Sequence, residues 1–247
     1  MEYQLDTAYF QVKIIADMLW YVSWTLSWYL FYKYFFKWHN ISIPFRNKEE
    51  KLFYYLWMFW FAMFFWILVS TFDYYIVHWA QKWIVLSKTV AWAIAWWVIA
   101  SETFKKIYKI KFNRWVLFVP SLTVWILVGR IWAFIIWLRD NTHWIATTLP
   151  WWYDYWDGVL RHPTQIYEII VLLSIFIIFI IWINYKKDWW INNWFFIFTF
   201  IYFTYRFLVW FIMPYSHFWL WLNTIQVVSI WMIMYSIYKL KKYAYGK

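Results

Sequence analysis

The chain has 247 residues, of which 66% are hydrophobic and 14% are charged, and it contains no cysteine. Soluble domains carry roughly 25% charged residues, and apolar runs of bilayer-spanning length recur here, so the composition excludes an ordinary soluble domain and favours a polytopic membrane protein. The lack of cysteine excludes disulfides, thiolate metal sites and a cysteine nucleophile, and the net charge of +11 follows a pattern of membrane orientation rather than of nucleic-acid binding.

Successive apolar runs predict an all-α fold of about seven transmembrane helices in a single transmembrane domain, 1–247. The expected spans lie at about 10–35, 52–72, 83–101, 115–137, 164–184, 190–212 and 218–238. The first six residues carry Glu2 and Asp6 instead of a basic region. We therefore expect the first run to be retained as a span and not to be removed as a signal peptide.

The basic residues predict how these spans are oriented. They concentrate in the segments after spans one, three, five and seven, at Lys37, Arg46, Lys48 and Lys51, at Lys105, Lys106, Lys109, Lys111 and Arg114, at Lys186 and Lys187, and at Lys239, Lys241, Lys242 and Lys247. The positive-inside bias places these segments in the cytoplasm, with the N-terminus outside and the C-terminus cytoplasmic. The longest outward-facing loop is then at about 138–163, and a loop of this length is more often functional than filler.

Three arginines are the first candidates for a functional site. Arg130 interrupts an apolar run, where a cation costs several kcal/mol unless it is paired or faces a polar cavity. Counted at 1.5 Å per residue, Arg130 lies about 22 Å and Arg206 about 24 Å along their spans, level with Arg161 at the outer mouth of span five. Three planar guanidiniums at one depth suit an anionic phosphate headgroup. The alternative is three separate arginines that snorkel to the interface.

Four short motifs follow one another along the second half of the chain: Gly129-Arg130-Ile131, Arg-His-Pro-Thr-Gln-Ile-Tyr-Glu at 161–168, Tyr-x-x-x-Arg at 202–206, and Gln-x-x-Ser at 226–229. Together they resemble the bacterial prolipoprotein diacylglyceryl transferase family. In that family the corresponding elements read Gly-Arg-(Ile/Leu)-Gly-Asn-Phe, Arg-His-Pro-Ser-Gln-Leu-Tyr-Glu, Tyr-x-x-x-Arg and Gln-x-x-Ser. Order, spacing and the N-out seven-span topology agree from about residue 70 onward.

The resemblance implies a multi-pass enzyme of the bacterial cell (inner) membrane. It would transfer a diacylglyceryl group from phosphatidylglycerol to the lipobox cysteine thiol in a prolipoprotein signal peptide, with glycerol phosphate as leaving group. No cofactor, metal or nucleic acid is implied. The implied catalytic residues are Arg130, Arg206, His162 and Tyr202, and the implied substrate-binding residues are Gly129, Arg161, Gln165, Tyr167, Glu168 and Gln226.

The chain departs from the family at several polar positions. The family's asparagine after Gly-Arg-x-Gly falls on Ala133, two of its glutamates fall on Leu138 and Trp210, and its third-span histidine has no counterpart in the stretch 87–90, Ser-Lys-Thr-Val. Asp140, His143 or His162 could therefore supply the general base. One alternative function is a catalytically impaired relative that still binds lipid. Another is a small-solute transporter, although paired broken helices or an internal repeat, which would favour it, are not visible in the sequence.

The tryptophan content is unusual, with 28 Trp and 3 Gly. Trp132 and Trp137 occupy positions that are glycine in the family, and Trp92 and Trp96 have the four-residue spacing at which small residues let membrane helices approach. We hypothesise that many of these tryptophans are glycines encoded by UGA, which some bacteria read as glycine. The alternative is a genuinely tryptophan-rich chain.

Overall fold

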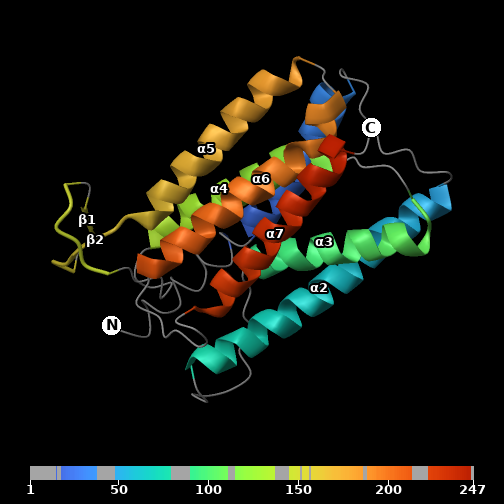
Figure 1. Ribbon diagram of the computed structural model, residues 1–247. Coiled ribbons are helices and arrows are strands. Elements are labelled where there is room, and N and C mark those ends of the chain that lie inside the picture. Colours follow the sequence, from blue (N-terminus) through green and yellow to red (C-terminus); the bar gives the residue numbers. More distant parts are fainter. Residues whose placement is uncertain are drawn as a thin grey trace. The chain divides into compact units, whose positions relative to one another are not determined.

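A computed structural model of the chain describes residues 15, 18–37, 48–78, 90–110, 115–136, 145–150, 152–155, 157–185, 188–212 and 222–245. Its elements are a helix over residues 18–30 that continues as the π-helix η1 (Phe31–Phe36), α2 (Lys48–His78), α3 (Val90–Ile107), η2 (Trp115–Phe118), α4 (Val119–Ile136), the strands β1 (Tyr153–Asp154) and β2 (Leu160–Arg161), α5 (Thr164–Ile183), α6 (Asp188–Val209), η4 (Trp210–Ile212) and α7 (Thr224–Tyr245) (Figure 1). The chain forms two compact units, residues 1–42 with 114–198, and residues 43–113 with 199–247.

The described residues are almost entirely helical, which confirms the predicted all-α fold. Within the described ranges, four stretches are long and apolar enough to cross a membrane: Lys48–Val69, Trp115–Ile135, Thr164–Trp182 and Trp189–Ile212. The count of seven spans and the orientation of the termini stay predictions.

Several helix boundaries differ from the expected spans because apolarity alone was used to place them: α2 ends at His78 rather than at about 72, and α7 at Tyr245 rather than at about 238. Helix α2 begins at Lys48, where Glu49 and Glu50 occupy the first turn and their charges are stabilised by the positive end of the helix dipole. Helix α3 continues past residue 101 to Ile107. It ends in a Schellman motif, in which Ile110 N donates to Lys105 O at 2.8 Å and Lys109 takes the left-handed conformation (φ 53°) usual for glycine.

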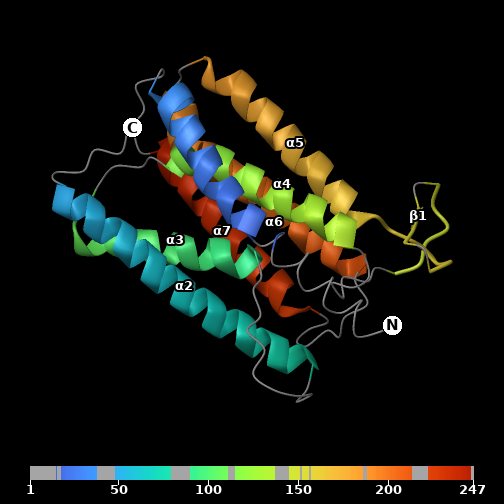
Figure 2. The same cartoon turned by 180° about the vertical axis from the view of Figure 1, so that it is seen from behind.

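The helix over residues 18–30 lies beside α4 in the first unit (Figure 2), and aromatic side chains join this N-terminal segment to α4 and α5. The indole Nε1 of Trp20 donates to the carbonyl of Trp125 at 2.7 Å, and the two rings stack with centroids 4.5 Å apart. Phe31 meets Phe176 of α5 edge-on, with centroids 5.7 Å apart. Gly129 lies under Trp20, since a Cβ at Gly129 would lie 2.9 Å from the Trp20 Nε1. The predicted site glycine therefore makes room for this ring.

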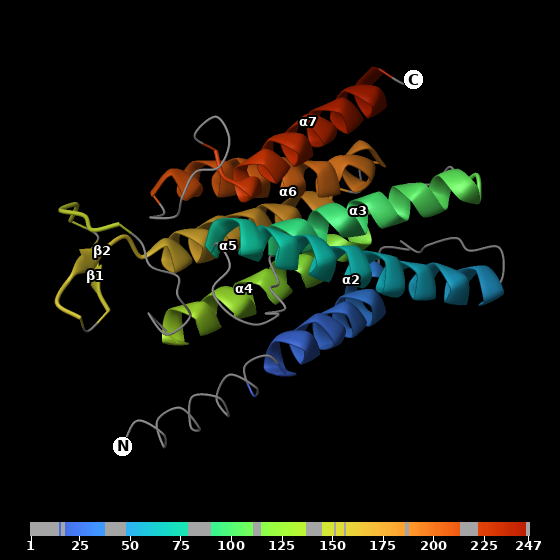
Figure 3. The same cartoon turned by 90° about the horizontal axis from the view of Figure 1, so that it is seen from below.

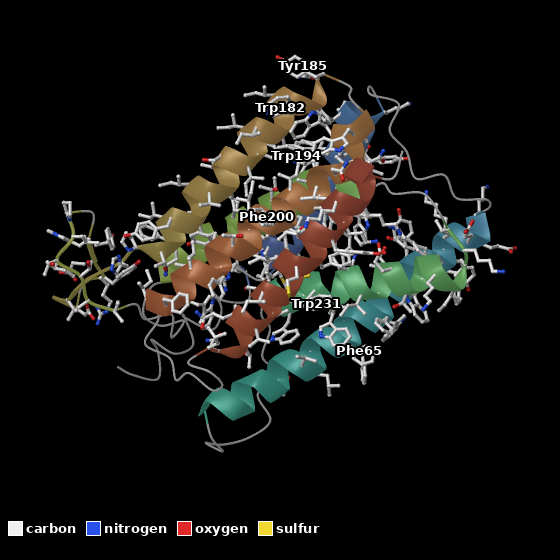
Figure 4. All side chains as sticks on the ribbon, viewed as in Figure 1. Phe65, Trp182, Tyr185, Trp194, Phe200 and Trp231 are labelled. Atoms are coloured by element: carbon white, nitrogen blue, oxygen red, sulfur yellow. The ribbon has the colours of Figure 1, made fainter. Side chains whose placement is uncertain are left out.

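Within the same unit, the end of α5 packs against the first part of α6. Trp182 stacks on Trp190 with ring centroids 4.5 Å apart, and the ring centroids of Trp194 and Phe179 lie 6.0 Å apart. Figure 4 shows Trp182 and Tyr185 at the C-terminal end of α5. These contacts fix the C-terminal end of α5, the helix whose first turns carry residues 164–168 of the motif at 161–168.

In the second unit, α2 lies alongside α3 (Figure 3). Trp57 Nε1 donates to the carbonyl of Ala100 at 3.1 Å, close to the buried side chain of Phe104. Helix α7 joins α3 through Lys239, whose Nζ is 2.6 Å from Glu102 Oε2. Lys105 approaches the other oxygen of Glu102 at 3.3 Å. Burial alone would raise the pKa of Glu102, but the charges of the two lysines hold that pKa below its usual value.

Candidate functional site

The segment immediately before α5 is a small antiparallel hairpin, in which Tyr153 pairs with Arg161 and Asp154 with Leu160. Figure 3 shows β1 and β2 beyond the N-terminal end of α5. The turn between the strands is held by Asp154 Oδ1, which accepts the backbone N–H groups of Asp157 at 3.2 Å and Gly158 at 3.1 Å. Gly158 has φ +74°, a conformation that favours glycine. The hairpin belongs to the loop predicted at about 138–163, of which residues 145–150, 152–155 and 157–163 are described.

Arg161 is paired within this hairpin. Its Nη1 lies 2.6 Å and 2.5 Å from the two carboxylate oxygens of Asp157. The hydrogen bond from Arg161 holds the pKa of the Asp157 carboxyl below its usual range. Arg161 was predicted to face a phosphate headgroup at the depth of two other arginines, and the structure gives it a carboxylate partner four residues away. Its role in substrate binding stays a prediction.

Arg130 of α4 forms an ion pair with Glu168 of α5, with Arg130 Nε 2.9 Å from Glu168 Oε1. The side chain of Glu168 is 3% exposed and that of Arg130 19% exposed. Both residues lie in stretches that are apolar and long enough to cross a membrane, where an ionised side chain needs a partner of opposite charge. The structure thus brings together two predicted site residues that lie 38 positions apart in the sequence.

Gln165 holds the hairpin against α5. The phenol of Tyr155 donates to Gln165 Oε1 at 2.8 Å, and both side chains are buried. Burial raises the pKa of the Tyr155 phenol well above its ordinary value. Sequence reasoning missed Tyr155, because a tyrosine in an aromatic-rich loop carries no signal that sets it apart from its neighbours.

His162 lies between the hairpin and α5, with its Nδ1 3.2 Å from the hydroxyl of Tyr167. Burial lowers the pKa of His162, which favours the neutral imidazole at physiological pH. Tyr167 also contributes to an apolar pocket of about 420 Å³. The pocket is lined by Trp152, Tyr153, Pro163, Ile166, Tyr167 and Ile170.

The remaining predicted site residues belong to the second unit. Arg206 is 6% exposed, Tyr202 is fully buried, and the guanidinium carbon of Arg206 lies 5.7 Å from the centre of the Trp210 ring. The family places a glutamate at the position of Trp210. A cation over an indole face is attracted by the ring quadrupole. Convergence of Arg206 with Arg130 on one cavity stays a prediction.

Gln226 takes part in a capping box at the start of α7. Asn223 Oδ1 accepts the N–H of Ile225 at 2.7 Å and that of Gln226 at 3.3 Å, while Gln226 Oε1 accepts the N–H of Asn223 at 3.0 Å. The side-chain amide of Gln226 also donates to the carbonyl of Phe207 at 3.3 Å. The Asn-x-x-Gln spacing at 223–226 could have revealed this structural role from the sequence.

Some predicted positions lie outside the described residues, among them two candidate bases, Asp140 and His143, and the stretch 87–89. Of the three candidate bases, His162 is therefore the one whose surroundings are described. No group of acidic residues and histidines that could hold a metal ion occurs in the described parts of the chain.

The family model described as prolipoprotein diacylglyceryl transferase matches residues 89–241, more than half of the chain. The matched range contains the Arg130–Glu168 pair, the octet at 161–168 and Arg206. No curated protein and no solved structure matches the chain significantly.

Proposed function

Because the chain belongs to the prolipoprotein diacylglyceryl transferase family, we propose that it moves a diacylglyceryl group from phosphatidylglycerol to the lipobox cysteine of a prolipoprotein. In this reaction the thiol sulfur bonds to the glyceryl carbon. The bond between that carbon and the phosphate oxygen breaks, and glycerol phosphate leaves with the electron pair. The acceptor protein supplies the thiol, which agrees with a chain that contains no cysteine. The proposed location is the bacterial inner membrane, with phosphatidylglycerol, the signal peptide and the membrane itself as partners.

The ion pair between Arg130 and Glu168 is the observation that carries this proposal. A buried carboxylate fixes the guanidinium through Nε at 2.9 Å. A guanidinium has five N–H donors in a planar fork, which matches the geometry of phosphate oxygens. Glu168 would orient Arg130 for the phosphate of the donor lipid. Arg130 would then stabilise the negative charge that develops on the leaving oxygen.

Arg206 is the proposed second ligand of the same phosphate. It is buried in an apolar helix beside Tyr202 and Trp210, and an arginine at such a position is a functional candidate by default. His162, Tyr202 and Tyr167 would complete the catalytic surroundings. The other proposed substrate-binding residues, Gly129, Arg161, Gln165 and Gln226, would act by shaping the site, in keeping with the packing, ion pair and hydrogen bonds described above.

The proposal is tested with purified protein, phosphatidylglycerol labelled in its diacylglyceryl part, and a synthetic lipobox peptide. We expect label on the peptide and release of unlabelled glycerol phosphate. A peptide with serine in place of cysteine serves as the acceptor control, and phosphatidylethanolamine serves as the donor control. If the protein labels no cysteine peptide from phosphatidylglycerol at any pH between 6 and 9, the proposed function is wrong.

The second candidate is a relative that binds the lipid without transferring it. Trp210 favours this reading, because an indole ring lies against Arg206 where the family carries a carboxylate. Binding of phosphatidylglycerol that depends on Arg130 and Arg206, together with no labelled peptide, would support this candidate over the transferase.

A further inference from the structure

A hydrogen bond between His162 and Tyr167 joins the residue that follows strand β2 to the first turns of α5. His162 precedes α5, and Tyr167 lies in the first turns of that helix. The imidazole Nδ1 is 3.2 Å from the phenol oxygen, and the rings meet edge-on with centroids 6.2 Å apart. Because Nδ1 faces Tyr167, Nε2 is the nitrogen through which this imidazole can reach a substrate.

We propose that His162, oriented by Tyr167, is the base that removes the proton from the acceptor thiol. This inference rests on the proposed transferase function. The thiol proton passes to Nε2 of His162, and the thiolate sulfur attacks the glyceryl carbon. The carbon–oxygen bond to the phosphate breaks at the same time, and the leaving glycerol phosphate takes its electron pair. The proton on His162 then returns to the leaving phosphate or to water, so that the enzyme is restored.

This step needs one tautomer of the imidazole. The lone pair must be on Nε2, so Nδ1 carries the hydrogen and donates it to the phenol oxygen of Tyr167. The phenol thus acts as the second group that fixes the tautomer and the ring, which is the usual arrangement around a catalytic histidine. Tyr167 is accordingly a positioning residue, and His162 is the residue that touches the substrate.

The surroundings of His162 fit a thiol better than a phosphate. Arg161, the adjacent cation, is already held by both oxygens of Asp157. The other titratable side chains of the described hairpin residues are those of Tyr153, Asp154 and Tyr155. Burial further lowers the pKa of His162 and so keeps it able to accept a proton near neutral pH.

The apolar pocket beside Tyr167 is consistent with an acceptor peptide at this place. Its walls come from the hairpin, through Trp152 and Tyr153, and from the first turns of α5, through Ile166 and Ile170. Along α5 its lining runs from Pro163 to Ile170, so it extends to both sides of the level of Glu168.

The decisive measurement is the pH dependence of the initial transfer rate for wild type and His162→Gln. The wild-type rate should rise with pH only up to the His162 pKa and then stay flat. At pH 7 the variant should be slower by about a hundredfold, within the range of general base catalysis. Its rate should then rise by about tenfold per pH unit and level off above about pH 8.5, where a free thiol is ionised on its own, within about threefold of wild type. Recovery at high pH also shows that the variant is folded.

Two further variants complete the comparison. Tyr167→Phe should lower kcat by about tenfold, with KM unchanged for lipid and peptide, and should keep the wild-type pH profile because the base is still present. His217→Gln, a histidine in another loop that the sequence predicts to face outward, should behave as wild type.

A His162→Gln enzyme with an unchanged rate and profile would overturn the proposal, as would one that stays inactive at pH 9. If His143→Gln, and not His162→Gln, shows the altered pH dependence of the rate, then His143 is the base. In each of these outcomes the wild type still transfers the diacylglyceryl group. The absence of any wild-type product would instead contradict the proposed function.

Discussion

Arg130 of α4 and Glu168 of α5 form an ion pair at 2.9 Å between two stretches that are each apolar and long enough to cross a membrane. Removing either partner of a buried ion pair is strongly destabilising, because the remaining charge loses its counter-ion in this pair, whereas replacing both partners by apolar side chains of similar size is often tolerated. Stability and catalysis therefore respond differently to the two kinds of change.

We predict that Glu168→Ala lowers the free energy of unfolding by about 3–5 kcal/mol. The double change Arg130→Met with Glu168→Leu should restore most of this stability but should show no diacylglyceryl transfer. Denaturation in detergent and the peptide-labelling rate measure the two properties separately. A double variant that is stable and active would show that the pair serves packing alone.

Arg206→Lys tests whether a guanidinium, rather than a positive charge, is required. Lysine is a point donor and cannot chelate two phosphate oxygens. We expect a loss of roughly a hundred- to a thousandfold in transfer rate, which corresponds to about 3–4 kcal/mol for a donor aimed at developing charge. Lys109→Ala, which removes an equally basic group from the end of α3, is the matched control and should transfer at nearly the wild-type rate. Equal, small losses in both variants would remove Arg206 from the mechanism.

The capping box at the start of α7 predicts an effect on stability alone. Asn223→Ala should lower the free energy of unfolding by about 1 kcal/mol, because the N–H groups of Ile225 and Gln226 lose their acceptor. Asn223→Asp should retain the cap and the stability. If instead Asn223→Ala raises the KM for phosphatidylglycerol without changing stability, this helix start would have to be assigned to the binding site.

The topology prediction can be tested directly because the chain has no cysteine of its own. Single cysteines introduced between Arg139 and Arg161 should react with a membrane-impermeant reagent in intact cells, and those between Lys105 and Arg114 should not. The reverse pattern of labelling would overturn the predicted orientation.

The tryptophan hypothesis predicts UGA codons at Trp92, Trp96, Trp132 and Trp137. Among the described residues, the indole N–H groups of Trp92 and Trp96 are buried without a hydrogen-bond partner. An unsatisfied buried donor costs about 1–3 kcal/mol, and glycine at these positions would remove that cost. The nucleotide sequence of the gene provides the measurement. UGG codons at these positions would contradict the hypothesis.

The sequence predicted the helices and the residues of interest better than their partners. Apolar runs located the helices, and a charge inside an apolar run marked Arg130, because both signals are local. The pairing with Glu168 depends on which faces of α4 and α5 meet, and side-chain packing sets that rotation. Likewise, Gln165 was predicted as a substrate ligand from its motif, whereas its contact with Tyr155 depends on how the hairpin folds back onto α5.

Glu102 carries a consequence for the order in which the protein is assembled. Lys105 is three residues away on the same helix, so this ion pair can form as soon as α3 exists. Lys239 lies 137 residues later and reaches the other carboxylate oxygen only after α7 has been synthesised. During synthesis Glu102 can therefore pair with Lys105 first, and its ion pair with Lys239 forms when α7 packs against α3. Ribosome-bound chains with and without residue 239 would differ in the ion pair between Glu102 and Lys239. The presence of this ion pair therefore indicates that α7 has packed against α3.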